Sequence, residues 1–66
     1  MKTIVFVCVH NSGRSQMAEA FFNDLAKGRA RAISAGTLPS DQVNPVVVEA
    51  MREVGIDISN NKPKAL

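Results

Sequence analysis

Apolar and polar positions along this chain predict two strands and two helices. Residues Thr3–Val7 form an uninterrupted run of β-branched and apolar side chains. A strand that is apolar on both faces is typical of the buried centre of a parallel sheet. Residues 32–35 predict a second, shorter strand, which we expect Gly36 and Pro39 to end.

One helix is predicted between the strands and one after them. The first runs from about residues 12–14 to Lys27, and Gly28 suits the left-handed position that ends a helix. The second begins at Asn44-Pro45, an N-cap Asn followed by Pro at the first helical position, and ends at Gly55. Their apolar stripes are Met17, Phe21 and Leu25, with Ala18 and Phe22 beside them, and then Val47, Met51 and Val54. We expect both Phe residues of the first helix to lie in the core.

This order, β-α-β-α, predicts the α/β class with a parallel sheet and a right-handed crossover. Two strands do not close such a core, because three or more are normally needed. We therefore expect residues 1–66 to be one partial domain without an internal boundary, the N-terminal half of a larger parallel-sheet domain. The other strands would come from absent sequence or from self-association with another copy. The polar tail 59–66, broken by Pro63, predicts no regular element.

The segment between the first strand and the first helix carries the chemistry. It reads Cys8-Val9-His10-Asn11-Ser12-Gly13-Arg14-Ser15, in which five residues separate the Cys from the Arg. A loop of this length can curl around a tetrahedral oxyanion with its backbone N–H groups inward, the thiol below and the guanidinium beside it. Ligands of open α/β sheets bind at this edge, where the N-terminus of a helix also favours anions.

Side chains of the loop suit such a site. A thiol at a helix N-terminus and near an Arg loses its proton more readily, and we predict that Cys8 is the nucleophile. The planar fork of Arg14 can hold two oxygens of the anion. Asn11 and Gly13 tolerate a left-handed backbone, and Ser15 can donate its hydroxyl to the thiolate. We expect the oxyanion to be bound by Val9, His10, Asn11, Ser12, Gly13, Arg14 and Ser15.

Plainer interpretations compete with each of these roles. A Cys at the end of a buried strand is more often a small apolar side chain, and an Arg that opens a helix is usually solvated. The combination in a strand–loop–helix context favours the functional interpretation. His10 could act as a base, but a loop that binds an anion through its backbone turns side chains outward, so we expect a structural role. Ordinary polar surface is expected at Glu19, Asp24, Arg29, Arg31, Glu49, Glu53, Lys62 and Lys64, of which the last two could border a substrate mouth.

Composition limits the partners. The chain has one Cys, one His and a formal net charge of +2. These 66 residues therefore contain no internal disulfide and too few ligands for zinc, so no metal is expected. Scattered positive charge without Trp or Tyr does not favour nucleic acid, and no segment is long enough to span a membrane. We expect no bound cofactor and, because a lone thiol fits a reducing compartment, a cytoplasmic protein.

The loop Cys8–Ser15 resembles the signature of the low-molecular-weight protein tyrosine phosphatases and of the arsenate reductases that share their fold. The longer run Cys-Val-His-Asn-Ser-Gly-Arg-Ser-Gln-Met-Ala-Glu-Ala, residues 8–20, is most similar to the arsenate reductase branch. So are Ser34-Ala35-Gly36-Thr37, Val43-Asn44-Pro45 and Gly55-Ile56-Asp57-Ile58-Ser59. The resemblance covers the chain but only about the first half of the family's domain, a four-stranded parallel sheet flanked by helices.

By this resemblance Cys8 attacks arsenate, Arg14 holds the oxyanion, and Asn11 and Ser15 support the loop and the thiolate. A second thiol then attacks the adduct, and arsenite leaves as a disulfide forms. Many relatives have a second Cys in the loop where this chain has Gly13, and often Gly where it has His10. The thioredoxin-coupled reductases keep their resolving Cys residues in the half that is absent here; if no second Cys exists anywhere, the second thiol must be external. We expect an external thiol reductant, thioredoxin or a low-molecular-weight thiol.

Three functions remain open at this point. Arsenate reductase is the leading hypothesis. The second is a low-molecular-weight protein tyrosine phosphatase, whose general-acid Asp-Pro pair is missing here, so that esters with poor leaving groups would react slowly. The third is a truncated, non-catalytic module that binds phosphate or arsenate.

Overall fold

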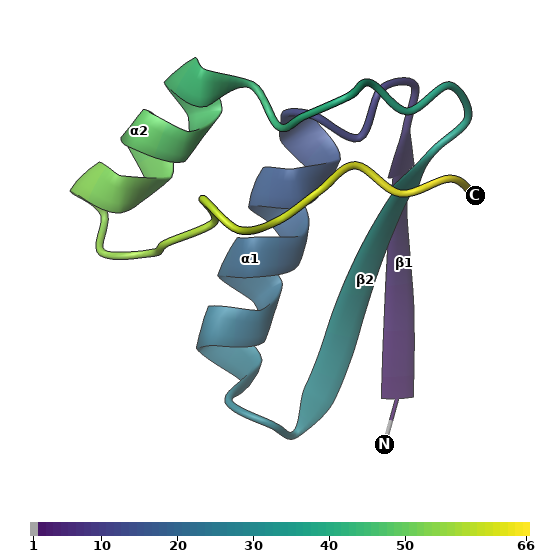
Figure 1. The fold of residues 1–66 in the computed structure, drawn as a ribbon. Coiled ribbons are helices and arrows are strands. Elements are labelled where there is room, and N and C mark those ends of the chain that lie inside the picture. Colours follow the sequence, from purple (N-terminus) through teal and green to yellow (C-terminus); the bar gives the residue numbers. More distant parts are fainter. Residues whose placement is uncertain (1) are drawn as a thin grey trace.

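The computed structural model describes residues 2–66, and its elements follow the predicted order. They are β1 (Lys2–Cys8), α1 (Arg14–Ala26), β2 (Ala30–Gly36) and α2 (Pro45–Glu53). Figure 1 shows α1 along one side of the two strands and α2 beyond it. Met1 lies outside the described residues. Both strands extend beyond the hydrophobic runs that predict them, because backbone pairing continues into small and polar residues.

The two strands pair in parallel over their full length. Lys2 lies opposite Ala30 and Cys8 lies opposite Gly36, so both carboxyl ends reach the same edge. α1 connects them, as a parallel pair requires. The predicted α/β class and β-α-β-α order are confirmed.

One face of the sheet packs on α1, and the described part of the chain places no layer on the other. The Phe6 ring meets Phe22 of α1 edge-on, with ring centroids 6.3 Å apart. Val5 and Val7 are 49% and 50% exposed, and Ile33 of β2 is 40% exposed. The expectation of a first strand buried on both faces is therefore wrong within residues 2–66. An apolar run permits burial of both faces, but burial also needs a second layer.

The buried side of α1 differs from the predicted stripe. Ser15 and Gln16 are buried, whereas Phe21 is 41% exposed and Leu25 is 73% exposed. The prediction that Phe21 lies in the core is wrong. A helical period locates an apolar side, but not the neighbours that cover it, and α2 lies beside only the N-terminal half of α1 (Figure 1).

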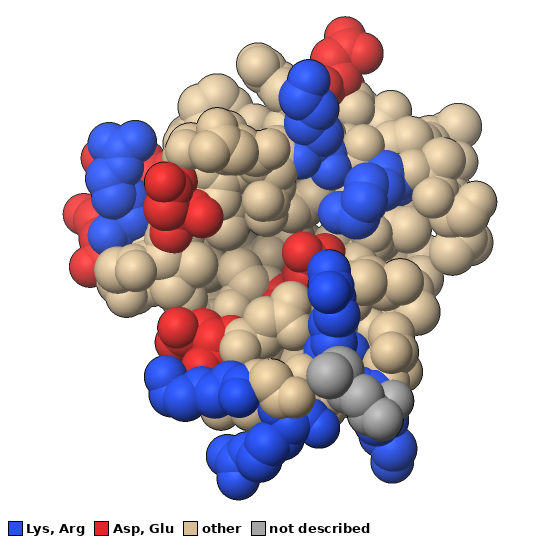
Figure 2. All heavy atoms as spheres, turned by 60° about the horizontal axis from the view of Figure 1, so that its bottom comes forward, with Lys and Arg blue, Asp and Glu red and all other residues tan. Residues whose placement is uncertain are grey.

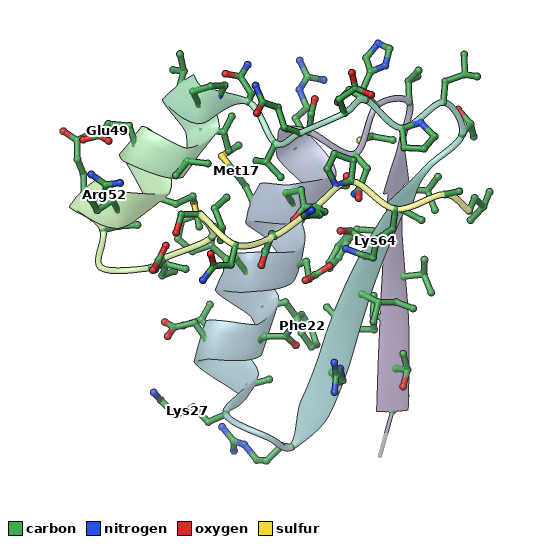
Figure 3. The ribbon with its side chains drawn as sticks, viewed as in Figure 1. Met17, Phe22, Lys27, Glu49, Arg52 and Lys64 are labelled. Carbon is green, nitrogen blue, oxygen red and sulfur yellow. The ribbon has the colours of Figure 1, made fainter. Side chains whose placement is uncertain are left out.

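The core lies between α1, α2 and the segment after α2. Val43, Met51 and Ile58 form a buried cluster, and Met17 packs against it; Figure 3 shows Met17 pointing from α1 toward α2. Val54 follows the last turn of α2 and is 59% exposed, so its predicted place in the apolar stripe is wrong.

The helix ends follow the predicted signals. The Asn44 side chain caps α2 by accepting a hydrogen bond from the N–H of Val46 at 2.9 Å. α1 ends at Lys27 and Gly28, whose φ angles are 49° and 89°, and Gly55 follows α2 with φ 85°. Left-handed residues therefore stop both helices, as the glycine pattern predicts.

The polar tail docks on the end of β2. Ala65 forms a parallel bridge with Gly36. The Gly36 N–H donates to the Lys64 carbonyl at 2.7 Å, and the Leu66 N–H donates to the Gly36 carbonyl at 3.0 Å. Figure 1 shows this tail, in yellow, crossing α1 and β2. Backbone hydrogen bonds hold it, which is why a hydrophobic pattern gave no sign of it.

Most charged side chains lie on the surface, as predicted. Figure 2 shows Lys and Arg gathered toward the end of the molecule that holds the α1–β2 turn, where Lys27, Arg29 and Arg31 are exposed. On the outer side of α2, Arg52 lies 3.2 Å from Glu49 in an exposed pair (Figure 3). Among the described residues, no helix combines the length and apolar character needed to cross a membrane.

Candidate functional site

The loop after β1 brings the thiol to the first turn of α1. The Cys8 sulfur lies 2.8 Å from Ser15 Oγ, and the N–H of Asn11 donates to it at 3.2 Å. Ser15 is buried, whereas Cys8 is partly exposed. The strand end positions the sulfur and the helix start positions the hydroxyl, so the predicted pair lies in direct contact.

The carbonyl groups of the loop turn toward the segment that follows β2. The carbonyls of Cys8, Val9, His10 and Ser12 accept from the N–H groups of Thr37, Leu38, Ser40 and Asn44 at 3.1, 2.8, 3.0 and 2.8 Å. In a trans peptide the C=O and the next N–H point in opposite directions. The N–H groups of residues 9, 10, 11 and 13 therefore point away from that segment, which is the arrangement that an anion-binding loop needs.

The surroundings of Cys8 lower the pKa of its thiol below the ordinary value. The largest cause is the hydrogen bond with the Ser15 hydroxyl. Backbone N–H groups of Asn11, Ser15 and His10 lower the pKa further, and partial burial opposes them. The positive end of the α1 dipole lies at the same place, and no side chain caps that helix at Gly13. The site thus favours a thiolate at the predicted nucleophile.

The loop turns at Asn11, whose φ of 52° is left-handed, as predicted. Gly13 has φ −143°, so the expectation that it supplies a left-handed turn is wrong. Asn11 is fully buried. Its Nδ2 donates to Ser15 Oγ at 2.8 Å, and its Oδ1 accepts from Gln16 Nε2 at 3.0 Å and from the Lys64 N–H at 2.8 Å.

Gly36 is a residue of the site that the sequence analysis treated only as a strand end. A Cβ there would lie 2.6 Å from the Val9 carbonyl oxygen and 3.0 Å from the Asn11 N and Cβ atoms. The loop backbone thus packs directly against the end of β2, where a side chain does not fit. A glycine at the carboxyl end of the neighbouring strand was the available signal for this close approach.

Arg14 is exposed at the first position of α1. With Cys8 and Ser15 it lines a hollow of about 300 Å³, whose other walls are Phe6, Val7 and Ala18. The thiol and the guanidinium therefore border the same space. The other walls of this hollow are apolar and residues 9–13 do not line it, so the oxyanion role of Arg14 stays a prediction.

The remaining loop side chains face outward. The His10 ring is exposed, and its Nδ1 lies 3.1 Å from the Leu38 carbonyl oxygen. Because a carbonyl only accepts, Nδ1 carries the hydrogen in this contact, which favours the structural role predicted for His10. Val9 is exposed and Ser12 is half-buried, and both join the loop to segment 37–44 through their carbonyls.

Glu19 is largely covered, contrary to the expectation of an ordinary surface residue, whereas Lys64 is exposed, as expected. Glu19 Oε1 accepts from Ser34 Oγ at 2.7 Å and lies 3.6 Å from Lys64 Nζ. Figure 3 shows Lys64 reaching from the tail over α1 and β2. The cluster joins three segments that are distant in sequence, so no local pattern could predict it. Within residues 2–66 no three His, Cys, Asp or Glu side chains come together as a metal site would require.

Comparisons with known proteins point to one family. The family model for low molecular weight phosphotyrosine protein phosphatases matches residues 3–66. The glutaredoxin arsenate reductase of Synechocystis sp. is 51% identical over 59 residues, which are 89% of this chain and 44% of that protein.

Two solved structures are also similar. The thioredoxin-dependent arsenate reductase of Corynebacterium glutamicum gives a TM-score of 0.95 at 41% identity, over 100% of this chain and 33% of that one. An arsenate reductase in its phosphate-binding state gives 0.92 at 44% identity, over 100% of this chain and 50% of that one. The chain thus spans half or less of the length of these relatives.

Proposed function

The chain belongs to the low-molecular-weight phosphotyrosine protein phosphatase family, and we propose that it carries the nucleophile of an arsenate reductase. One observation supports this proposal: the Cys8 sulfur is hydrogen-bonded to the Ser15 hydroxyl, inside a loop whose backbone carbonyls turn outward. Arsenate reductases that are 41% to 51% identical to the chain support the choice of reaction. These relatives are at least twice as long as the chain, which therefore matches only part of each enzyme. The activity of a whole arsenate reductase is for this reason also a proposal here.

The first step is attack on the oxyanion. The Cys8 thiolate donates an electron pair to arsenic, an S–As bond forms, and one arsenate oxygen leaves as water after protonation. Arg14 and the inward N–H groups of the loop balance the charge on the other oxygens. The hydroxyl of Ser15 stabilises the thiolate before attack, and again when a further thiol releases Cys8 from the disulfide formed in the second step.

The second step is reduction by an external thiol. Its thiolate attacks the Cys8 sulfur, a disulfide forms, and the S–As electron pair leaves with arsenic as arsenite. Two electrons thus pass from two sulfur atoms to arsenic, and a further thiol restores Cys8. Thioredoxin or a low-molecular-weight thiol fits this role, and a similar arsenate reductase is thioredoxin-dependent.

Arsenate-dependent oxidation of dithiothreitol by the 66-residue chain tests this function. We expect oxidation in proportion to the protein, and none with Cys8→Ser. Ser40→Ala is the matched control, because the Ser40 hydroxyl is exposed and donates its hydrogen bond to the Gln42 carbonyl, away from the sulfur. A folded wild-type chain that oxidises no thiol in the presence of arsenate contradicts the proposal.

The family match supports one alternative reaction. A phosphatase would form a phosphocysteine at Cys8 and release it to water. Hydrolysis of an aryl phosphate without added thiol, together with no arsenate reduction, favours this alternative. Anion binding that survives Cys8→Ser, without either turnover, favours a non-catalytic oxyanion module.

We also propose that residues 1–66 act as one partial domain. The two-stranded sheet leaves Val5, Val7 and Ile33 substantially exposed. Further strands would pair at the edge of this sheet, and a second layer would cover the face; both would come from a longer chain or from another copy.

A further inference from the structure

We propose that Gln16 is a positioning residue, which holds the Asn11 amide in the orientation that leaves the Ser15 hydroxyl hydrogen free for the Cys8 sulfur. The inference rests on the proposed function of Cys8 and extends it to a residue that does not touch the reacting atoms. It also makes the docked tail a part of the site.

The backbone partners identify the oxygen and the nitrogen of each side-chain amide, because a backbone N–H only donates and a carbonyl only accepts. The Lys64 backbone N–H can only donate, so the Asn11 atom at 2.8 Å from it is the oxygen Oδ1. The Lys62 carbonyl can only accept, so the Gln16 atom at 3.3 Å from it is the nitrogen Nε2. The same Nε2 donates to Asn11 Oδ1 at 3.0 Å. Asn11 Oδ1 therefore accepts from two donors, the Lys64 N–H and Gln16 Nε2, which hold the amide in this orientation.

With its oxygen fixed, Asn11 presents Nδ2 to Ser15 Oγ at 2.8 Å. Ser15 Oγ then accepts one hydrogen bond and has its own hydrogen to donate. The Cys8 sulfur lies 2.8 Å away and receives it. An Asn11 amide turned over would place Oδ1 against Ser15 Oγ, accept that hydrogen, and leave the thiolate without its principal stabilising contact.

Burial makes this orientation costly to lose. Gln16 and Asn11 are both 0% exposed, so water does not replace a missing partner, and hydrogen bonds in such surroundings are stronger than in water. Gln16 is in turn held by the tail, since Asn61 Nδ2 donates to Gln16 Oε1 at 3.2 Å. All described buried side-chain N and O atoms have partners. The chain of contacts therefore runs from the tail through Gln16 and Asn11 to Ser15 and the sulfur.

α1 carries a matched control for the substitution. Asn23 is another amide side chain of this helix, and it forms two hydrogen bonds with the backbone of Ala32 in β2. Its Oδ1 accepts from the Ala32 N–H at 2.8 Å, and its Nδ2 donates to the Ala32 carbonyl at 3.0 Å. It touches no residue of the loop in these contacts. Replacing Asn23 removes two structural hydrogen bonds, against three at Gln16, without reaching the sulfur.

The test is the pH dependence of Cys8 alkylation by iodoacetamide in the 66-residue chain, with folding checked by circular dichroism. Gln16→Met keeps the side-chain length but has no hydrogen-bond donors, and we expect the thiol pKa to rise. At a pH below both pKa values, alkylation should slow roughly 3- to 10-fold. We expect Asn23→Met to leave the profile unchanged.

Gln16→Glu covers the case in which Gln16→Met does not fold. It preserves shape, but an ionised carboxylate cannot donate to Asn11 Oδ1, so the pKa should rise here too. A folded Gln16 variant with the wild-type profile, or an equal shift in Asn23→Met, overturns the inference. An ordinary thiol pKa in the wild type would instead contradict the proposed function itself.

Discussion

Replacing Ser15 with Ala should return the Cys8 thiol toward ordinary behaviour. The substitution removes the 2.8 Å contact between Ser15 Oγ and the sulfur, which is the largest cause of the lowered pKa. A hydrogen bond to a charged group contributes ~1.5–3 kcal/mol, and one pKa unit corresponds to ~1.36 kcal/mol. Because Cys8 is partly exposed, the lower end applies, and we expect the pKa to rise and the thiolate fraction at low pH to fall roughly tenfold.

Alkylation by iodoacetamide across pH measures this shift directly. At a pH below both pKa values the rate for Ser15→Ala should be roughly tenfold lower than for the wild type, with equal rates once both thiols are ionised. Ser40→Ala is the matched control, because it removes an exposed hydroxyl of another loop.

The same substitution leaves Asn11 Nδ2 without its acceptor in a buried place. We expect a loss of about 1–3 kcal/mol in unfolding free energy, which circular dichroism in urea will report. A folded Ser15→Ala chain whose alkylation profile matches the wild type would refute the role of the Ser15 hydroxyl.

Three further predictions follow from the same contacts. Gly36→Ala should displace the loop, because its Cβ would lie 2.6 Å from the Val9 carbonyl; overpacking of this kind costs ~1–3 kcal/mol, and an unchanged urea midpoint and thiol pKa would show that the loop does not pack there. Asn44→Ala should lose the cap on Val46 and ~0.5–2 kcal/mol of unfolding free energy, with the Cys8 alkylation profile unchanged; a stability equal to the wild type would contradict the cap. Since the folded pKa of Cys8 is lowered, ionised Cys8 stabilises the fold above the unfolded-chain pKa of ~8.5, and this contribution disappears as pH falls through the folded value. The difference in urea midpoint between wild type and Cys8→Ser should therefore grow with pH across that interval, and a constant difference would argue against the shift.

The elements were predictable because their signals are local. A β-branched run marked β1, Asn44-Pro45 marked the start of α2, and glycines marked both helix ends. Cys8 and Ser15 could also be placed at one point, since a strand end and the following helix start are neighbours in sequence.

What failed depended on contacts between distant segments. Periodicity gave α1 an apolar side but could not show that Phe21 and Leu25 would remain exposed. The contacts of Gln16 with residues 61 and 62 join positions 45 and 46 apart in sequence, and the Glu19–Lys64 pair is similarly distant. Such buried polar contacts leave no periodic trace, so only the folded arrangement reveals them.

Protection of Cys8 by arsenate is the most direct measurement of whether this loop is a working oxyanion site. Iodoacetamide alkylation of the wild-type chain would be followed across pH, with and without arsenate. We expect a thiol that titrates well below ~8.5 and an alkylation rate that falls as arsenate rises. A thiol with the ordinary pKa, alkylated equally fast at every arsenate concentration, would contradict an assembled nucleophile site in this chain.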